Sequence, residues 1–167
     1  GSWCCLAFAG RLDCAEWLGS ASTHMVSGSG GGRIATGQRL RVCAVQDRDR
    51  RAIACPVSAR PRPRPRVVMG PQQRFFAPQQ IADFLAGPWR MTDAWDRMGV
   101  RLSGPLIAPR AALDIPSEPV LRGSVQVAGD GVATVLLADH QTTGGYPKIA
   151  TALDCDLDGF VQLRPRD

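Results

Sequence analysis

Apolar side chains fall in short runs along much of this 167-residue chain, and turn-forming residues separate the runs. Residues 39–45 alternate between polar and apolar positions, which is typical of a half-buried strand. Further short strands are predicted at residues 67–69, 89–92, 100–102, 124–127, 134–138 and 149–153. This pattern predicts a mainly β fold, closed or sandwiched, and disfavours a doubly wound α/β sheet.

One segment, residues 78–86, has the periodicity of an amphipathic helix. Pro78 suits a first helical position because its missing N–H has no partner there in any helix. Ile81, Phe84 and Leu85 recur at the spacing that places side chains on one helical face, and a Gly-Pro pair follows as a stop. We therefore expect a helix over residues 78–86 with these three side chains on one face.

The acidic run at residues 154–159 resembles the first half of a calcium-binding loop. Such a loop needs a bidentate carboxylate at its twelfth position, and Pro165 stands there without a side-chain oxygen. We reject calcium binding and predict instead a short helix, with Asp156 at or near the cap and Leu157 and Phe160 facing inward.

Arginine and proline alternate over residues 60–66, and a second arginine cluster lies at residues 48–51. Such clusters can contact nucleic acid or another acidic surface. No aromatic side chain is interleaved with these arginines for base stacking, however. We therefore predict a solvated, extended connector and expect no nucleic-acid partner.

Metal and membrane binding find little support in the composition. The six cysteines form no CxxC pair and are accompanied by only two histidines, so no metal site is expected. No apolar run reaches the roughly 18 residues of a membrane span, and the apolar opening lacks the basic flank of a signal peptide. We expect reduced, buried thiols in a cytoplasmic protein without membrane contact.

An unusual group of polar residues, 139–146, follows the predicted strand that contains Val135-Leu136-Leu137. Loops at the end of a rigid strand commonly carry binding groups. His140 could transfer protons near neutral pH, and the neighbouring polar side chains could bind a small polar ligand. An ordinary polar turn remains the alternative. The candidate residues are Asp139, His140 and Gln141 for catalysis, and Thr142, Thr143, Gly144, Gly145 and Tyr146 for substrate binding.

Two arginines, Arg97 and Arg101, flank a predicted turn at Met98-Gly99. A guanidinium group binds carboxylates and phosphates well, so Arg97 joins the candidate substrate-binding residues. A solvated structural ion pair is the alternative for both arginines.

The run QTTGGYPKIAT, at residues 141–151, resembles the hallmark segment of the family formed by the C subunits of 5-oxoprolinase. That family is also known as allophanate hydrolase subunit 2, Kip antagonist or biotin-dependent carboxyltransferase A/B domain. Further similar motifs follow in the family's order: GSWCCLAFAGRLDCAEWLGSASTHM, GPQQRFF, DRMGVRLSGP and IPSEPVLRGSVQVAGDG. The resemblance covers nearly the whole chain.

The resemblance implies a cyclophilin-like fold with two related β-barrel subdomains. Residues 1–58 would hold the end of the first, residues 59–66 the Arg/Pro connector, and residues 67–167 the second without its last strand. Such a chain is expected to have exposed sheet edges and to depend on partners for stability or activity.

The resemblance also implies an activity that the chain would carry out together with partner proteins. The lead hypothesis is the C subunit of an ATP-dependent 5-oxoprolinase that cleaves 5-oxo-L-proline to L-glutamate together with the A and B subunits. One alternative is carboxyl transfer from carboxybiotin to urea, as in urea amidolyase. The other is a non-catalytic regulator of a protein similar to the B subunit. In both enzymatic hypotheses the substrate is a small amide or lactam.

Three positions depart from the family pattern: Arg11, Ala21 and Arg166. Arg11 stands in place of a glycine and Ala21 in place of an arginine that could bind an anion, and Arg166 replaces a turn glycine. These changes direct the site hypothesis to the second subdomain.

Overall fold

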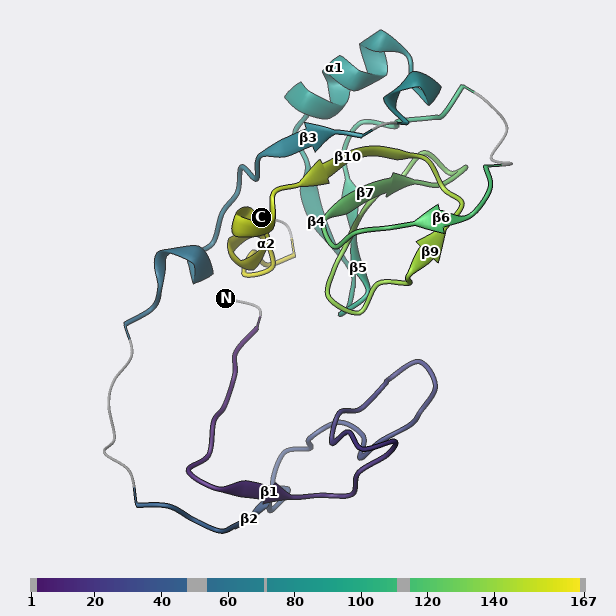
Figure 1. Cartoon of the computed structure of the whole chain (residues 1–167). Coiled ribbons are helices and arrows are strands. Elements are labelled where there is room, and N and C mark those ends of the chain that lie inside the picture. Colours follow the sequence, from purple (N-terminus) through teal and green to yellow (C-terminus); the bar gives the residue numbers. More distant parts are fainter. Residues whose placement is uncertain (1–2, 48–53, 71, 111–114, 166–167) are drawn as a thin grey trace. The chain divides into compact units, whose positions relative to one another are not determined.

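The computed structural model describes residues 3–47, 54–70, 72–110 and 115–165. The chain divides into two compact units (Figure 1), one of residues Cys5–Ile53 and one of residues Ala54–Asp167 together with Gly1–Cys4. The arginine cluster at 48–51 and the departure at Arg166 lie outside the described residues.

A six-stranded antiparallel sheet forms the centre of the larger unit (Figure 1). Its strands, in spatial order, are β3 (Val67–Met69), β10 (Lys148–Ala152), β7 (Ser124–Val127), β8 (Ala133–Leu136), β5 (Gly99–Ser103) and β4 (Arg90–Trp95). A separate two-stranded ribbon joins β6 (Glu118–Pro119) to β9 (Thr143–Gly144). The prediction of a mainly β fold with one or two short helices is confirmed, and strand boundaries shift by at most a few residues.

One face of this sheet forms the core. Val100 lies opposite Val135, Val135 opposite Val125, and Val125 opposite Ala150, so an apolar row crosses four strands. None of the four is more than 5% exposed. Complete burial of one valine side chain contributes on the order of 1.5–3 kcal/mol relative to exposure.

Helix α1 (Pro78–Ala86) has the predicted bounds. Phe84 is buried and Ile81 packs against the core, as expected. Leu85, which the pattern placed on the same face, is 58% exposed. Trp89, just after the helix, packs beside Phe84 instead. Its Nε1 donates to the Phe84 carbonyl oxygen at 2.8 Å, and its ring contacts the Phe84 ring. The buried stripe of this short helix is therefore narrower than its sequence pattern.

Helix α2 (Asp154–Phe160) begins near the predicted position, but Asp156 is not its cap. Leu153 holds the cap position, and the Asp156 carboxylate is fully buried in the first turn. Arg66 donates to it from Nε and Nη2, both at 2.9 Å, and Arg62 lies 3.3 Å away. The Arg66 hydrogen bond holds the pKa of Asp156 well below its usual range.

Arg62 and Arg66 of the Arg/Pro tract remain 40% and 62% exposed, as expected for a solvated connector, but both also pair with the buried Asp156 carboxylate. The backbone N–H of Arg62 also donates to the Gly159 carbonyl oxygen at 3.0 Å. A Cβ atom on Gly159 would lie 2.5 Å from the Arg60 carbonyl oxygen, so a glycine is needed where the tract crosses α2. The short 3₁₀ turn η1 (Val57–Ala59) precedes this crossing, and another, η2 (Gln73–Phe75), precedes α1.

Within residues 5–47 of the smaller unit, β1 (Arg11–Asp13) pairs antiparallel with β2 (Arg41–Cys43), so the strand predicted at 39–45 is confirmed in part. Arg11 and Ala21 are both exposed. The expectation of buried thiols is wrong: Cys43 is half-buried, and the exposed ones are Cys4, Cys5, Cys14, Cys55 and Cys155. No helix in the described part of the chain is long and apolar enough to cross a membrane.

Candidate functional site

A row of polar side chains crosses the face of the sheet opposite the core. Lys148 in β10 lies opposite Gln126 in β7, Gln126 opposite Thr134 in β8, and Thr134 opposite Arg101 in β5. Directly paired residues place their side chains on the same face, and neighbours along a strand place theirs on the other. The same four strands that build the apolar core row therefore build this polar row.

Part of this polar face forms the floor of an open cleft of about 610 Å³. Its lining comes from β4, β5, β7 and β8 and from the loop that follows β8. The polar and charged side chains from the strands and turns are Asp93, Asp96, Arg101, Gln126 and Thr134. Clefts of this size with a few convergent polar groups suit small polar ligands.

Two of the predicted site residues, Gln141 and Tyr146, line the cleft. The Gln141 Nε2 atom donates to Gln126 Oε1 at 3.0 Å. Gln126 is only 4% exposed, and its own Nε2 has no partner among the described residues. A buried donor without an acceptor is costly, so this amide is suited to donate to a ligand oxygen.

His140 is not among the described residues that line the cleft, and its side chain contacts the backbone of Gln141. Its Nδ1 lies 2.6 Å from the Gln141 carbonyl oxygen, so Nδ1 donates and the ring fixes the Gln141 peptide. In a neutral ring, Nε2 is then the atom that can accept a proton. This hydrogen bond therefore joins two residues that are already neighbours in the sequence.

Asp139 and Arg97 form a bidentate ion pair, with Arg97 Nε 2.6 Å and Nη2 2.8 Å from the two carboxylate oxygens. The hydrogen bond to Asp139 raises the pKa of Arg97. Arg97 also lines a separate hollow of about 110 Å³ with Arg122. This pair anchors the beginning of the polar loop to the turn between β4 and β5.

The rest of the predicted loop forms β9 and its flanks. Thr142 and Thr143 are exposed, and Gly144 lies opposite Glu118 in the ribbon with β6. A Cβ on Gly144 would lie 2.7 Å from Gln126 Nε2, and one on Gly145 would lie 2.9 Å from the Ile115 carbonyl oxygen. The glycines therefore allow close approach of the loop backbone, here to the buried amide and to a neighbouring segment.

The charged groups of the cleft are held by the fold. Asp96 accepts from the backbone N–H groups of Met98 and Gly99 and closes the turn between β4 and β5. Arg101 Nη2 lies 2.5 Å from Asp130 Oδ2. The Val132 N–H, and then Arg101, lower the pKa of Asp130, so this carboxylate remains ionised.

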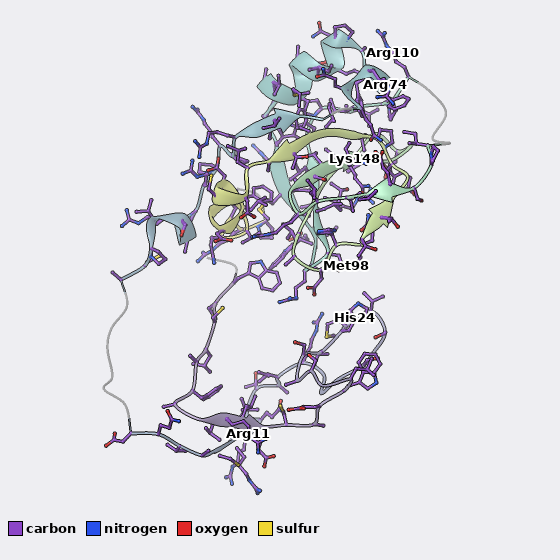
Figure 2. The ribbon with its side chains drawn as sticks, viewed as in Figure 1. Arg11, His24, Arg74, Met98, Arg110 and Lys148 are labelled. Atoms are coloured by element: carbon purple, nitrogen blue, oxygen red, sulfur yellow. The ribbon has the colours of Figure 1, made fainter. Side chains whose placement is uncertain are left out.

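Sequence reasoning missed a second polar cluster next to the cleft, formed by Gln72, Glu118 and Lys148. Lys148, at the start of β10 (Figure 2), is only 6% exposed, and its Nζ donates to Glu118 Oε1 at 2.6 Å. Gln72 accepts from the Lys148 backbone N–H at 2.8 Å and donates to the same Glu118 oxygen. The composition contained a signal, since Lys148 is the chain's only lysine among 20 Lys and Arg residues.

A second cavity, of about 670 Å³, opens on the apolar face of the sheet. It is lined largely by core side chains such as Phe84, Trp89 and Phe160. Arg64 and Arg90 are the polar side chains in its lining, so the cleft on the other face, with five polar side chains from its strands and turns, is the better candidate for a polar ligand. No group of three metal-binding side chains occurs among the described residues.

Fold and site together define the class of protein, which is an antiparallel β unit with an open cleft over one face of its sheet. The chain belongs to the family described as carboxyltransferase domain, subdomain A and B, whose model matches residues 1–167. This confirms the family resemblance found in the sequence.

Two curated relatives are both named as the C subunit of 5-oxoprolinase. The one from Escherichia coli (strain K12) is 34% identical over 161 residues, which are 95% of this chain and 52% of that protein. The one from Haemophilus influenzae is 43% identical over 76 residues, 46% of this chain and 25% of that protein. The chain therefore spans about half the length of the Escherichia coli relative.

Among solved structures, the urea carboxylase of Kluyveromyces lactis has a TM-score of 0.73 and 24% identity. The match covers 95% of this chain and 16% of that one. At this identity the likeness concerns the fold alone, and it supports the predicted fold class.

Proposed function

We propose that this chain belongs to the C subunit of an ATP-dependent 5-oxoprolinase, which cleaves 5-oxo-L-proline to L-glutamate together with the A and B subunits. The alignment of 161 residues with the C subunit of a 5-oxoprolinase carries the proposal. The polar cleft supports it, because a lactam presents one carbonyl oxygen and one N–H to the paired amides.

In this proposal Gln126 and Gln141 bind the lactam group. The unpartnered Gln126 Nε2 donates to the lactam oxygen, and Gln141 keeps the Gln126 amide in place. His140 fixes the Gln141 peptide through Nδ1, and its Nε2 serves proton transfer. Asp139 and Arg97 position the loop, with Gly144 allowing its close approach. Thr142, Thr143, Gly145 and Tyr146 complete the binding loop.

The cleft does not fit the triphosphate of ATP. Its lining includes the carboxylates of Asp93 and Asp96, which would repel the multiply charged triphosphate. The only glycine-rich stretch, at residues 28–32, lacks the spacing and the Lys-Ser/Thr of a phosphate-binding loop. We therefore assign ATP binding to a partner protein.

The proposal is tested by adding the chain to the A and B subunits and measuring 5-oxoproline-dependent ATP hydrolysis. We expect Gln141→Ala to lower kcat/KM at least about tenfold, and His140→Ala at least about a hundredfold. Gln79→Ala is the matched control, since Gln79 is an exposed glutamine on α1 that bonds Asp83. Wild-type turnover in both cleft variants would contradict the proposal.

Carboxyl transfer from carboxybiotin to urea is the second candidate, favoured by the family description. Urea and the biotin ureido ring share the N–H and carbonyl pattern of a lactam, so the same amide pair would bind them. Labelled bicarbonate separates the two: incorporation into urea in the presence of a biotin carboxylase and carrier supports transfer, and glutamate release supports lactam cleavage.

We further propose that the two compact units correspond to the two related barrel subdomains expected from the family, with residues 59–66 as the connector between them. The division of the chain near residue 54 is compatible with this arrangement.

A further inference from the structure

The cluster of Lys148, Glu118 and Gln72 has no role in the binding of the lactam group described above. Its lysine is unusual in two respects. It is the one lysine of the chain, and the remaining residues among the 20 Lys and Arg are all arginines. The lysine side chain is also only 8% exposed, whereas lysine is almost never buried without a specific partner.

The Lys148 ammonium has spare hydrogen-bonding capacity. It carries three N–H donors, and its acceptor among the described side chains is Glu118 Oε1 at 2.6 Å. Glu118 is itself 44% exposed, so the carboxylate rather than the lysine faces solvent. A ligand oxygen that enters beside Glu118 can therefore accept from the remaining ammonium hydrogens.

The cluster is continuous with the amide pair of the cleft. Lys148 is directly opposite Gln126 across β10 and β7, and Cβ atoms of such pairs lie about 5 Å apart. Glu118 is directly opposite Gly144, whose backbone lies against the Gln126 amide. Lys148 and Gln126 thus hold directly paired positions on one face of the sheet, where Gln126 lines the cleft and Lys148 lies one strand beyond the cleft lining.

We propose that Lys148 is a further substrate-binding residue of this site, which binds the carboxylate of a small lactam acid while Gln126 binds its lactam group. In such an acid the carboxylate is carried by the ring carbon next to the lactam nitrogen. The carboxylate and the lactam group are therefore close enough for neighbouring positions on adjacent strands to bind them. Glu118 and Gln72 are positioning residues that hold the ammonium and the start of β10. The inference rests on the proposed function, since it assigns the ionic end of that substrate.

A lysine suits this position better than an arginine. Its compact ammonium fits a site closed on most sides and leaves donors free in directions that a planar guanidinium would not reach. Arginine serves the exposed and bidentate pairs elsewhere in the chain, as in the pairing of Arg97 with Asp139.

The test uses the full chain labelled with ζ-¹⁵N lysine, which gives a single side-chain amine resonance because there is one lysine. The probes are 5-oxo-L-proline and 2-pyrrolidinone, which is the same lactam without the carboxylate. We expect 5-oxo-L-proline to shift the Lys148 resonance and to bind at least about tenfold more tightly than 2-pyrrolidinone. We expect 2-pyrrolidinone to leave that resonance in place.

Lys148→Met removes the charge at similar length and should equalise the affinities for the two probes, while binding of 2-pyrrolidinone changes less than about twofold. Arg90→Met removes one exposed cation from the same sheet and should keep the preference for 5-oxo-L-proline. Equal binding of both probes by the wild type, or a preference retained in Lys148→Met, overturns the role of Lys148 alone. Binding of neither probe overturns the lactam assignment of the cleft and this inference with it. The lysine resonance gives the answer in the wild type even if the methionine variant fails to fold.

Discussion

The two compact units of this chain use apolar residues in opposite ways. In the larger unit, valine, isoleucine and phenylalanine side chains from the sheet and helices form one buried cluster. In the described part of the smaller unit, residues 5–47, no residue is buried. Its exposed large apolar side chains are Leu6, Phe8, Trp17, Leu18, Met25, Val26, Ile34 and Val45.

Hydrogen bonding differs between the units in the same way. In residues 5–47 most bonds are local, such as that from Thr23 Oγ1 to the Gly32 carbonyl oxygen at 3.1 Å. In the larger unit, Arg66 bonds Asp156 across 90 positions of sequence. Local bonds shape loops without much net stability, because water competes for the same groups, whereas a shared core makes unfolding cooperative. The larger unit should therefore account for nearly all of the measurable free energy of unfolding.

Substitution of one isoleucine in each unit tests this comparison most strongly. Ile149 is fully buried, so Ile149→Ala should lower the free energy of unfolding by about 2–5 kcal/mol through lost burial and a cavity. Ile34 is 70% exposed, so Ile34→Ala should change it by less than about 0.5 kcal/mol. Urea denaturation followed by circular dichroism measures both. Equal losses would show that residues 5–47 share the cooperative core.

The sequence pattern was sufficient for the local features of the larger unit. The helix at 78–86 and the strand at 124–127 have the predicted bounds, because periodicity and turn residues act over a few positions. The polar loop after β8 was also located, and Gln141 and Tyr146 do line the cleft.

What the pattern could not provide was the pairing of distant strands. The polar row depends on the register of β10 against β7, which shifts at an irregularity between Lys148 and Ala150. A shift by one residue would turn side chains to the other face. The placement of Gln126 and Lys148 on the polar face therefore follows only from the tertiary structure. The burial of Asp156 by Arg66 has the same origin.

Two ion pairs, one in each unit, test the same difference in stability with a smaller expected effect. Asp156→Asn should lower Tm by roughly 5 °C or more, because it leaves Arg66 and Arg62 without their buried carboxylate. Asp13→Asn should leave Tm within about 1 °C, since the Asp13–Arg41 pair is 3.6 Å long and exposed on both sides. Thermal unfolding at neutral pH compares the two. A larger effect at Asp13 would contradict the assignment of stability to the larger unit.

The same pair predicts the response to acid. The pKa of Asp156 is lowered in the folded state, mainly by the Arg66 hydrogen bond. A carboxylate with a lowered folded pKa binds fewer protons when folded, so its stabilisation is complete above the unfolded pKa of about 4. That contribution is lost as pH falls below about 4 toward the folded pKa. Asp156→Asn should therefore flatten the decline of Tm in this range, whereas Asp13→Asn should not.

The smallest expected effect concerns the turn at Trp17–Ser20. Leu18 and Gly19 both have positive φ, at 49° and 73°, and Trp17 and Ser20 exchange two backbone hydrogen bonds. This is the geometry of a type I′ turn, which favours Asn-Gly and disfavours leucine. Leu18 is 84% exposed, so replacing it removes no core contact.

Leu18→Asn should therefore stabilise the turn by about 0.5–1 kcal/mol, seen as roughly threefold slower hydrogen exchange at the Trp17 and Ser20 amides. The global free energy of unfolding should stay the same, because this turn opens without the core. In the larger unit, Gly123 also has positive φ, at 88°, but a Cβ there would lie 2.7 Å from the Ala152 carbonyl oxygen. Gly123→Ala should consequently lower global stability. If Leu18→Asn raised global stability as well, residues 5–47 would be energetically coupled to the core, and the contrast between the two units would fail.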